Sequence, residues 1–361
     1  MNASVAFDAV RANADERIRD VTAKVAAFTI GLDNKGYKNW EFAPVINGLI
    51  ALGEDEHLRA ARRIVDLGVA LQNSEGQLAF GLNIVQGEAG NAVERWTGAK
   101  TITGTVHSSS YGPGTLYFHR RLDDPRYLDA ARRQYEYVKT VRRSRDGGIV
   151  HREETTELWV DTVYFTVPFL AQYAMAAGSP EAADEARRQI RVHTERLRDA
   201  RTGLFRHIWC ETPDHFPQST FWSRGQGWIA ASLVDAFEAF PAGHEGRGEA
   251  AAILERMAGA LLERQDASGF WHNVIDDPRA ALEASGTALC VYSLRKALDL
   301  GMLEGEGYAQ SARRGMLALL EAVRDDGAVG MVSLPPGGPN AKYGWAPYGQ
   351  GAFLLAASRY R

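Results

Sequence analysis

Two kinds of helical stretch alternate along this chain, and this alternation limits the possible folds more than any other feature. One kind is charged and amphipathic, with apolar residues at i, i+3, i+4 and i+7, as in residues 55–71 and 124–141. The other is small and apolar on nearly every side, as in residues 161–178 and 225–240. No apolar run approaches the ~18 residues of a membrane span, so we expect no membrane association. The apolar helices must therefore be surrounded by protein.

A glycine-centred phrase separates the two kinds of helix. It consists of an acidic or small residue, then glycine, then two or three apolar or aromatic residues, and it predicts a tight turn that opens a short extended stretch. The phrase recurs at Gly76, Gly148, Gly203, Gly269 and Gly327, with a looser version at Gly36.

Six charged stretches alternate with six apolar ones at a spacing of roughly 55 to 70 residues, a period typical of stacked supersecondary units. Ser179 and Pro180 predict the start of one outer helix, as N-cap and first helical residue. We predict an all-α fold, an (α/α)6 toroid forming a single domain over residues 1–361. An open solenoid is the alternative, but it would need polar caps, which neither terminus resembles. The last inner helix runs almost to Arg361, where a ring would close.

The composition excludes several classes of function. The chain has 41 basic and 45 acidic side chains and no Lys/Arg-rich run, which argues against nucleic-acid binding. Its two cysteines, Cys210 and Cys290, form no CxxC motif, and no HExxH motif is present, so we expect no metal and no cofactor. The N-terminus mixes charges and does not resemble a signal peptide, which predicts a cytoplasmic protein. The sequence does not indicate an oligomeric state.

The N-terminal ends of the inner helices should share one rim of the toroid. Aromatic faces with few polar groups suit sugar rings, and helix N-termini beside Arg224 favour an anion, so we predict that a small acidic oligosaccharide binds there. Alternatively, the tryptophans only plug the ring and Arg224 pairs internally. The residues expected at this rim are Trp40, His107, Trp159, Asp161, Trp222, Arg224, Trp228, Glu283 and Trp345.

Asp161 opens an otherwise apolar helix, and Trp159 should help to desolvate it. This setting predicts a raised pKa and a proton donor, although a carboxylate serving the helix dipole is equally compatible. His151, His207 and His272 each follow a glycine turn by three or four residues, so all three could face the cavity or be structural.

Two further rim residues have an equally plain structural interpretation. Glu283 precedes Ser285 and Thr287, a pattern that favours a helix cap over a functional carboxylate. His107, beside Ser108 to Ser110, is equally compatible with loop and cap chemistry.

Several segments resemble glycoside hydrolase family 105, the unsaturated uronyl hydrolases, and more distantly family 88. HREETTELWVDTVYFTVPFL contains the histidine and the W-x-D-x-x-Y pattern, and GLFRHIW is followed by FWSRGQGW, which contains W-x-R-G-x-G-W. The resemblance implies that Asp161 is the catalytic acid/base. It also implies that the substrate-site residues include His151, His207, Trp222, Arg224 and Trp228.

The family acts on oligosaccharides whose terminal uronic acid carries a C4=C5 double bond, the product of polysaccharide lyases. The resemblance therefore implies hydration of this enol ether. One carboxyl group would protonate C4 and deprotonate the water that adds at C5, and the resulting hemiketal would open and expel the remaining sugar. Ordinary glycosidases instead need two carboxyl groups across the anomeric centre.

The chain departs from the family pattern at two places. Where the family usually has a second aspartate, before the second inner helix, this chain has His107 and Ser108; Gln226 replaces the asparagine of R-G-N-G-W. Either Glu283 or Glu41 supplies the supporting charge, or the substrate differs, or activity is lost. Two other functions stay open: a sugar epimerase of the N-acylglucosamine type that uses the histidines, and a non-catalytic carbohydrate-binding protein.

Overall fold

The computed structural model describes residues 3–33, 37–84, 106–335 and 337–361, and they form paired outer and inner helices. The outer helices are α1 (Ala3–Ile30), α3 (Asp55–Ala70), α7 (Pro125–Thr140), α9 (Pro180–Leu197), α11 (Glu245–Glu263) and α13 (Glu306–Glu321). The inner helices are α2 (Ala43–Leu52), α6 (Gly112–Leu122), α8 (Val160–Ala177), α10 (Ser223–Ala239), α12 (Ala284–Asp299) and α14 (Pro347–Ala357). Shorter helices are α4 (Gly81–Ile84), η1 (Asn39–Phe42), η2 (His107–Tyr111) and η3 (Ser358–Tyr360).

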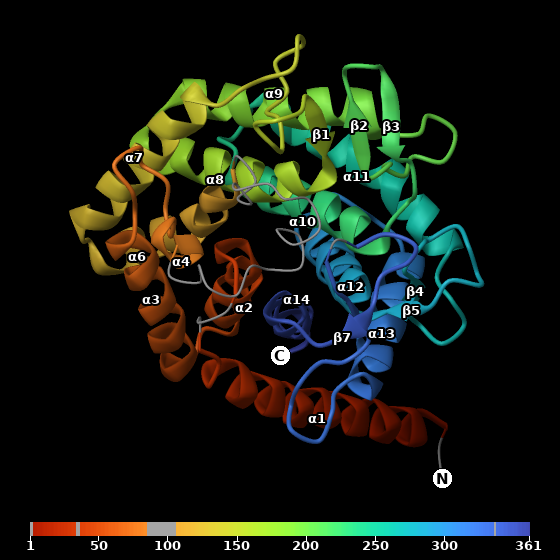
Figure 1. Cartoon of the computed structure of the whole chain (residues 1–361). Coiled ribbons are helices and arrows are strands. Elements are labelled where there is room, and N and C mark those ends of the chain that lie inside the picture. Colours follow the sequence, from red (N-terminus) through yellow and green to blue (C-terminus); the bar gives the residue numbers. More distant parts are fainter. Residues whose placement is uncertain (1–2, 34–36, 85–105, 336) are drawn as a thin grey trace.

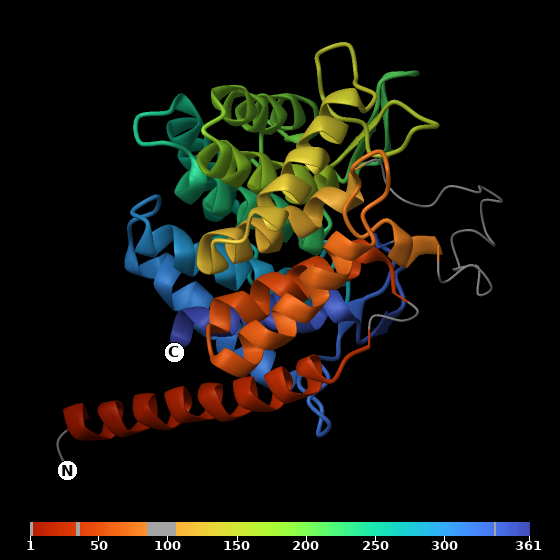
Figure 2. The same cartoon turned by 90° about the vertical axis from the view of Figure 1, so that its left-hand side faces the viewer.

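The inner helices close into a ring because α14 packs between α12 and α2, while the outer helices surround them (Figure 1). The closing contact is tight: a Cβ atom on Gly351 would lie 2.1 Å from the backbone carbon of Pro44. This confirms the predicted toroid and excludes the open solenoid. Figure 2 shows that α1 continues beyond the body of the ring toward the N-terminus.

The two helix types are buried as their patterns predict. Helix α8 buries thirteen of its residues and continues through Pro168, whereas α7 buries one face only. Helix α9 begins as expected, with the Ser179 hydroxyl accepting a hydrogen bond from the Ala182 amide at 3.3 Å. Among the helices described, none is both long enough and apolar enough to cross a bilayer.

The predicted glycine turns are present in the described residues, but in one of them the glycine with positive φ is the neighbour of the predicted one. Gly76, Gly203, Gly269 and Gly327 have φ between 76° and 100°. In the remaining phrase Gly147, with φ 91°, takes the left-handed position in place of Gly148. A Cβ atom on Gly148 would lie 2.9 Å from Leu158, so that glycine is required for space. The predicted turn at Gly36 lies outside the described residues.

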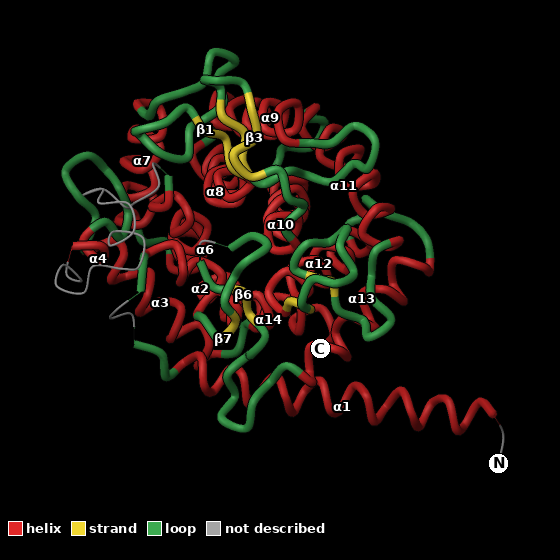
Figure 3. The backbone as a smooth tube through the Cα atoms, turned by 45° about the vertical axis from the view of Figure 1, so that its right-hand side comes forward, coloured by secondary structure: helices red, strands yellow, loops and turns green. Residues whose placement is uncertain are grey.

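Short antiparallel strands follow most of these turns and lead into the inner helices (Figure 3). One sheet has the order β1 (Glu157–Trp159), β2 (Ile208–Cys210) and β3 (His215–Gln218). Two pairs are β4 (Trp271–His272) with β5 (Leu282–Glu283), and β6 (Val332–Ser333) with β7 (Tyr343–Gly344). In the first sheet Trp159 pairs with Ile208, and the Val160 amide donates to the His207 carbonyl at 3.2 Å. This register places the start of α8 beside His207.

Candidate active site

Aromatic, histidine and arginine side chains form a continuous circuit at the N-terminal ends of the inner helices. We call this circuit the mouth ring. Successive ring centroids, or a guanidinium carbon and a ring centroid, are 4.2 to 6.1 Å apart. In order, its members are Trp40, His107, His151, Trp159, His207, Trp222, Arg224 and Tyr348, which contacts Trp40 again. Seven of these eight were expected from the sequence as candidate rim, cavity or substrate-site residues.

Asp161 lies in the first turn of α8, and its carboxylate faces the mouth ring. Its Oδ2 is 3.1 Å from Nε2 of His207, whose Nδ1 contacts the side-chain oxygen of Gln218. The Asp161 side chain is 15% exposed, so water reaches it although its neighbours are buried. The pairing of β1 with β2 and the side chain of Gln218 in β3 thus position His207, which in turn contacts the Asp161 carboxylate.

The predicted rise in the pKa of Asp161 is wrong. Burial alone raises this pKa, but the hydrogen bond from His207 and the charges of His207 and Arg224 are among the effects that lower it to about 2. Trp159 contributes by stacking on His151 at 4.3 Å and packing edge-on against His207 at 5.3 Å. At neutral pH Asp161 is therefore ionised and ready to accept a proton.

His107 and His151 form a buried pair where the family pattern has an aspartate. Their Nε2 atoms are 3.3 Å apart, and Nδ1 of His151 is 3.0 Å from the Thr162 hydroxyl. Burial is the main cause that lowers the pKa of both, to about 3 for His151. The pair is thus neutral at pH 7, which leaves this part of the mouth ring without the negative charge of an aspartate.

Arg224 is almost fully buried. One of its terminal nitrogens binds other parts of the protein, whereas its Nε binds none of the described residues. Its Nη1 donates to the Ser333 carbonyl at 2.7 Å and to the Ser285 hydroxyl at 3.1 Å, and lies 3.8 Å from Glu283. Its Nε, like the indole Nε1 of Trp222, is buried with no hydrogen-bond partner among the described residues. The internal pairing expected as an alternative is therefore present, but it occupies only part of the guanidinium group.

Glu283 is the N-cap of α12, which confirms the cap interpretation. Its carboxylate accepts hydrogen bonds from the amides of Ser285 at 3.1 Å and Gly286 at 2.5 Å, and from the Ser333 amide at 3.0 Å. The residue is fully buried. With its oxygens occupied in this way, Glu283 is not available to replace the missing aspartate beside a ligand.

Glu41 has a different environment. It lies in η1, directly before α2, where its Oε1 accepts a hydrogen bond from the Lys38 amide at 3.0 Å. Burial raises the pKa of Glu41 to about 7, although that hydrogen bond and the charges of Lys38 and Arg224 act in the opposite direction. The environment of Glu41 therefore allows it to keep a proton near neutral pH.

The other substitution in the family pattern is structural. The side chain of Gln226 accepts from the Phe205 amide at 2.9 Å and donates to the Phe205 carbonyl at 2.6 Å. Gln350 binds the Val329 amide and the Gly327 carbonyl in the same way. These two glutamines attach the stretches at Gly203 and Gly327 to inner helices. Gln226 is therefore occupied by the backbone and does not face a ligand.

Three predicted residues lie away from the mouth ring. Trp228 is buried beneath it and packs on Tyr164, with ring centroids 4.2 Å apart. Trp345 packs edge-on against Phe28 of α1 at 5.3 Å. His272 is not in the mouth ring, because its Nδ1 contacts the Ala280 carbonyl at 2.6 Å.

Sequence reasoning missed Tyr348 and Gln218. Tyr348 begins the last inner helix, so its place in the repeat could have identified it as a rim residue. Gln218 lies in β3, and no local sequence signal indicates that this strand reaches His207.

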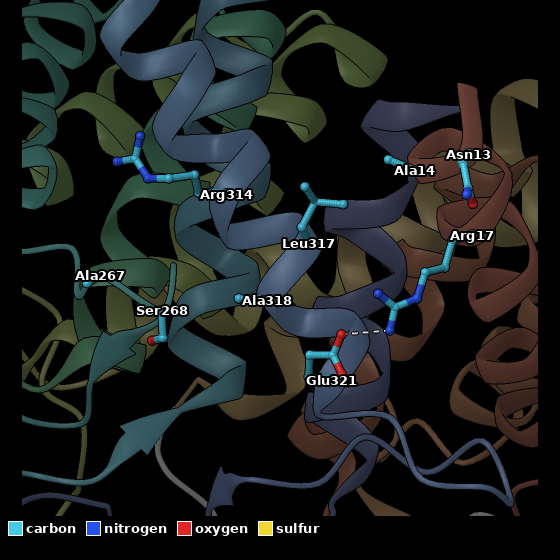
Figure 4. A pocket seen from close by; sticks show the side chains of 9 residues that line it. All are labelled: Asn13, Ala14, Arg17, Ala267, Ser268, Arg314, Leu317, Ala318 and Glu321. Atoms are coloured by element: carbon cyan, nitrogen blue, oxygen red, sulfur yellow. Dashed lines mark hydrogen bonds and ion pairs between the residues drawn. The ribbon is translucent and has the colours of Figure 1, made fainter. Parts of the chain in front are cut away.

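A groove of about 520 Å³ lies elsewhere, on the outer surface between α1 and α13 (Figure 4). Arg17 and Glu321 form an ion pair at 2.6 Å across it, and none of its lining residues belongs to the mouth ring. Of the described residues, Glu54, Glu56 and His57 could together approach a metal ion, but they lie at the start of α3, and Glu54 is paired with Arg361. Neither feature contributes to the candidate site.

Comparisons with known proteins agree with this geometry. The model of Glycosyl Hydrolase Family 88 matches residues 93–361. The chain is 27% identical over 236 residues to the unsaturated rhamnogalacturonyl hydrolase YesR of Bacillus subtilis, covering 63% of this chain and 67% of that protein. It is also 27% identical over 212 residues to an unsaturated 3S-rhamnoglycuronyl hydrolase of Formosa agariphila, covering 55% of this chain and 56% of that protein.

Solved structures match nearly the whole chain. A possible member of family GH105 from Salmonella enterica has a TM-score of 0.79 at 23% identity, covering 96% of this chain and 94% of that one. The unsaturated glucuronyl hydrolase of Bacillus sp. GL1 has a TM-score of 0.70 at 15% identity, covering 95% and 96%. These likenesses show the shared toroid fold. The family match over residues 93–361 shows that this chain belongs to Glycosyl Hydrolase Family 88.

Proposed function

We propose that this protein removes a terminal 4,5-unsaturated uronic acid from oligosaccharides produced by polysaccharide lyases. The observation that carries the proposal is the ionised Asp161, held by His207 at a helix N-terminus that faces the mouth ring. The names of the relatives, a rhamnogalacturonyl and a rhamnoglycuronyl hydrolase, support this class of substrate.

Substrate binding follows from the unused donors of the mouth ring. Nε of Arg224 and Nε1 of Trp222 need an acceptor, since an unsatisfied buried donor costs about 1–3 kcal/mol. A sugar carboxylate would satisfy such donors and compensate the positive charge of Arg224. Trp40 and Trp159, which are only partly buried, offer apolar faces to the sugar ring.

The reaction adds one water molecule across the C4=C5 bond. The Asp161 carboxylate takes a proton from water as the water oxygen bonds to C5, and C4 receives a proton. The product at C5 is a hemiketal. Its ring opens to a ketone at C5 and a hemiacetal at C1, and the breakdown of this hemiacetal releases the remaining sugar with its hydroxyl group. His207 keeps Asp161 ionised between turnovers, so Asp161 acts as the base in this step.

A lyase-product assay tests the proposal. Unsaturated disaccharides, first those derived from rhamnogalacturonan, should lose the near-UV absorbance of their conjugated acid on incubation with the protein. We expect Asp161→Asn to lower kcat by at least about 10³-fold while substrate affinity stays within a few-fold, since asparagine keeps the shape and cannot accept the proton.

Equal rates for the wild type and Asp161→Asn would remove Asp161 from the mechanism. Conversion of a saturated amino sugar to an isomer of the same mass would instead identify an epimerase. Tight sugar binding without turnover in either form would identify a carbohydrate-binding protein.

A further inference from the structure

Glu41 is a buried carboxyl group directly before the inner helix α2, and the proposed hydration gives it no role so far. Glu41 precedes α2 as Asp161 opens α8, so both belong to inner-helix N-termini and to the same rim of the toroid. Glu283, the other carboxyl group considered, is occupied by three amides.

Arg224 connects the two carboxyl groups. Its guanidinium carbon is 4.2 Å from the centroid of Trp222 and 4.7 Å from that of Tyr348. On the Trp222 side, the circuit continues to His207 at 4.6 Å and so to Asp161. The charge of Arg224 acts on both Asp161 and Glu41.

On the Tyr348 side, the circuit continues to Trp40, the residue before Glu41. The rings of Tyr348 and Trp40 stack at 5.3 Å, and Glu41 is the next residue after Trp40. Glu41 also interacts electrostatically with Tyr348 itself. A substrate carboxylate bound at Arg224 would therefore lie between the part of the mouth ring next to Asp161 and the part next to Glu41.

The two groups differ in protonation. Burial raises the pKa of Glu41 to about 7 against the opposing effect of Lys38 and Arg224, and Tyr37 and Tyr348 are its other titratable neighbours. The pKa of Asp161 is about 2. Environments that separate the pKa values of two carboxyl groups are how enzymes assign an acid and a base.

We infer that Glu41 donates the proton that C4 receives, while Asp161 removes the proton from the water that attacks C5. This inference rests on the proposed hydration. As the Glu41 O–H bond breaks, a C4–H bond forms and positive charge develops at C5, where the water oxygen bonds and loses its proton to Asp161. Glu41 then regains a proton from solvent, and Asp161 returns one.

Glu41→Gln tests this assignment. Glutamine keeps the oxygen that accepts from the Lys38 amide, so η1 should stay intact. We expect kcat to fall about 10²- to 10⁴-fold with KM within about 3-fold. The wild-type kcat/KM should decrease above about pH 7 as Glu41 ionises, and the variant should lack this decrease.

Two further measurements separate a chemical role from a structural one. Glu41→Asp, which keeps a carboxylic acid at this position, should retain part of the activity that Glu41→Gln loses. The folded-state pKa of Glu41 lies above its unfolded value, so the stability that its protonated form gives is lost as pH rises through about 7. The melting temperature of Glu41→Gln should therefore rise relative to wild type between pH 5 and pH 8.

The control variant is Glu304→Gln, an exposed residue outside the mouth ring, which should leave rate and pH profile unchanged. If the wild type is active and Glu41→Gln keeps its rate and its decrease above pH 7, the assignment is overturned while the hydrolase proposal stands. If the wild type converts no unsaturated disaccharide, both fail.

Discussion

Two buried cations occupy opposite ends of the α10 and α12 pair, and their surroundings differ. Near the C-terminal ends, Lys296 lies 2.8 Å from Asp235 and 2.7 Å from Glu238, and Tyr292 donates to Asp235 at 2.6 Å. Near the N-terminal ends, Arg224 uses one terminal nitrogen for internal bonds, and its Nε has no hydrogen-bond partner in the part of the chain that the structure describes.

This difference separates a structural cluster from a binding one. The polar groups around Lys296 satisfy one another, so the cluster fixes how the helices pack. Within the described residues, two buried donors of the mouth ring, Nε of Arg224 and Nε1 of Trp222, have no hydrogen-bond partner. Such donors cost stability, and an acidic ligand can satisfy them. Charge alone therefore does not identify the site, since both clusters contain a buried ion pair.

Lys296→Met should have the largest effect, and it should be on stability alone. Burial by itself lowers the pKa of Lys296, but Asp235, Tyr292 and Glu238 raise it overall, so the lysine is charged and its removal leaves Asp235 unpaired. We expect the free energy of unfolding in urea to fall by about 3 kcal/mol. The KM of the folded variant should stay unchanged; a raised KM would show that the two ends of the helices are coupled.

Arg224→Lys should have an intermediate effect, chiefly on binding. Lysine keeps the charge and loses the planar group with its unused Nε donor. We expect KM for an unsaturated disaccharide to rise roughly 10- to 100-fold, with a loss of stability of about 1 kcal/mol. An unchanged KM would mean that Arg224 only supports the fold, as Lys296 does.

His207→Asn should have the smallest effect at neutral pH and a clear effect in acid. Without the imidazole, burial acts on Asp161 with less opposition, so its pKa should rise from about 2 by about one unit or more. The acidic limb of kcat/KM should then move to higher pH, because Asp161 must be ionised to act as a base. A limb at the wild-type position would show that His207 does not control this ionisation.

The helices were predictable because their signals are local. The period of apolar residues identified inner and outer helices, and the N-cap at Ser179 needed only adjacent residues. The described glycine turns were located to within one residue: Gly147 rather than Gly148 has the positive φ, and the tight space at Gly148 depends on side chains distant in sequence such as Val192.

The sequence predicted most residues of the candidate site, but it did not predict the protonation state of Asp161. Placing Asp161 at a rim required only the direction of its helix, but its pKa depends on His207, forty-six residues away and delivered by strand pairing. Similar reasoning placed Trp345 at the rim, and the spacing after a glycine turn made His272 a candidate for the cavity. In the structure Trp345 packs on Phe28 and His272 contacts the Ala280 carbonyl, so neither belongs to the mouth ring.

The amino-acid pattern by itself determined a ring of paired helices and the set of aromatic and ionisable residues at one of its ends. Only the folded ring decided which carboxyl group is ionised, which is protonated and which is used as a cap. The physical reason is range: helix formation depends on neighbours three or four residues apart, whereas the charge of a carboxyl group depends on burial and on partners that only closure of the ring brings together.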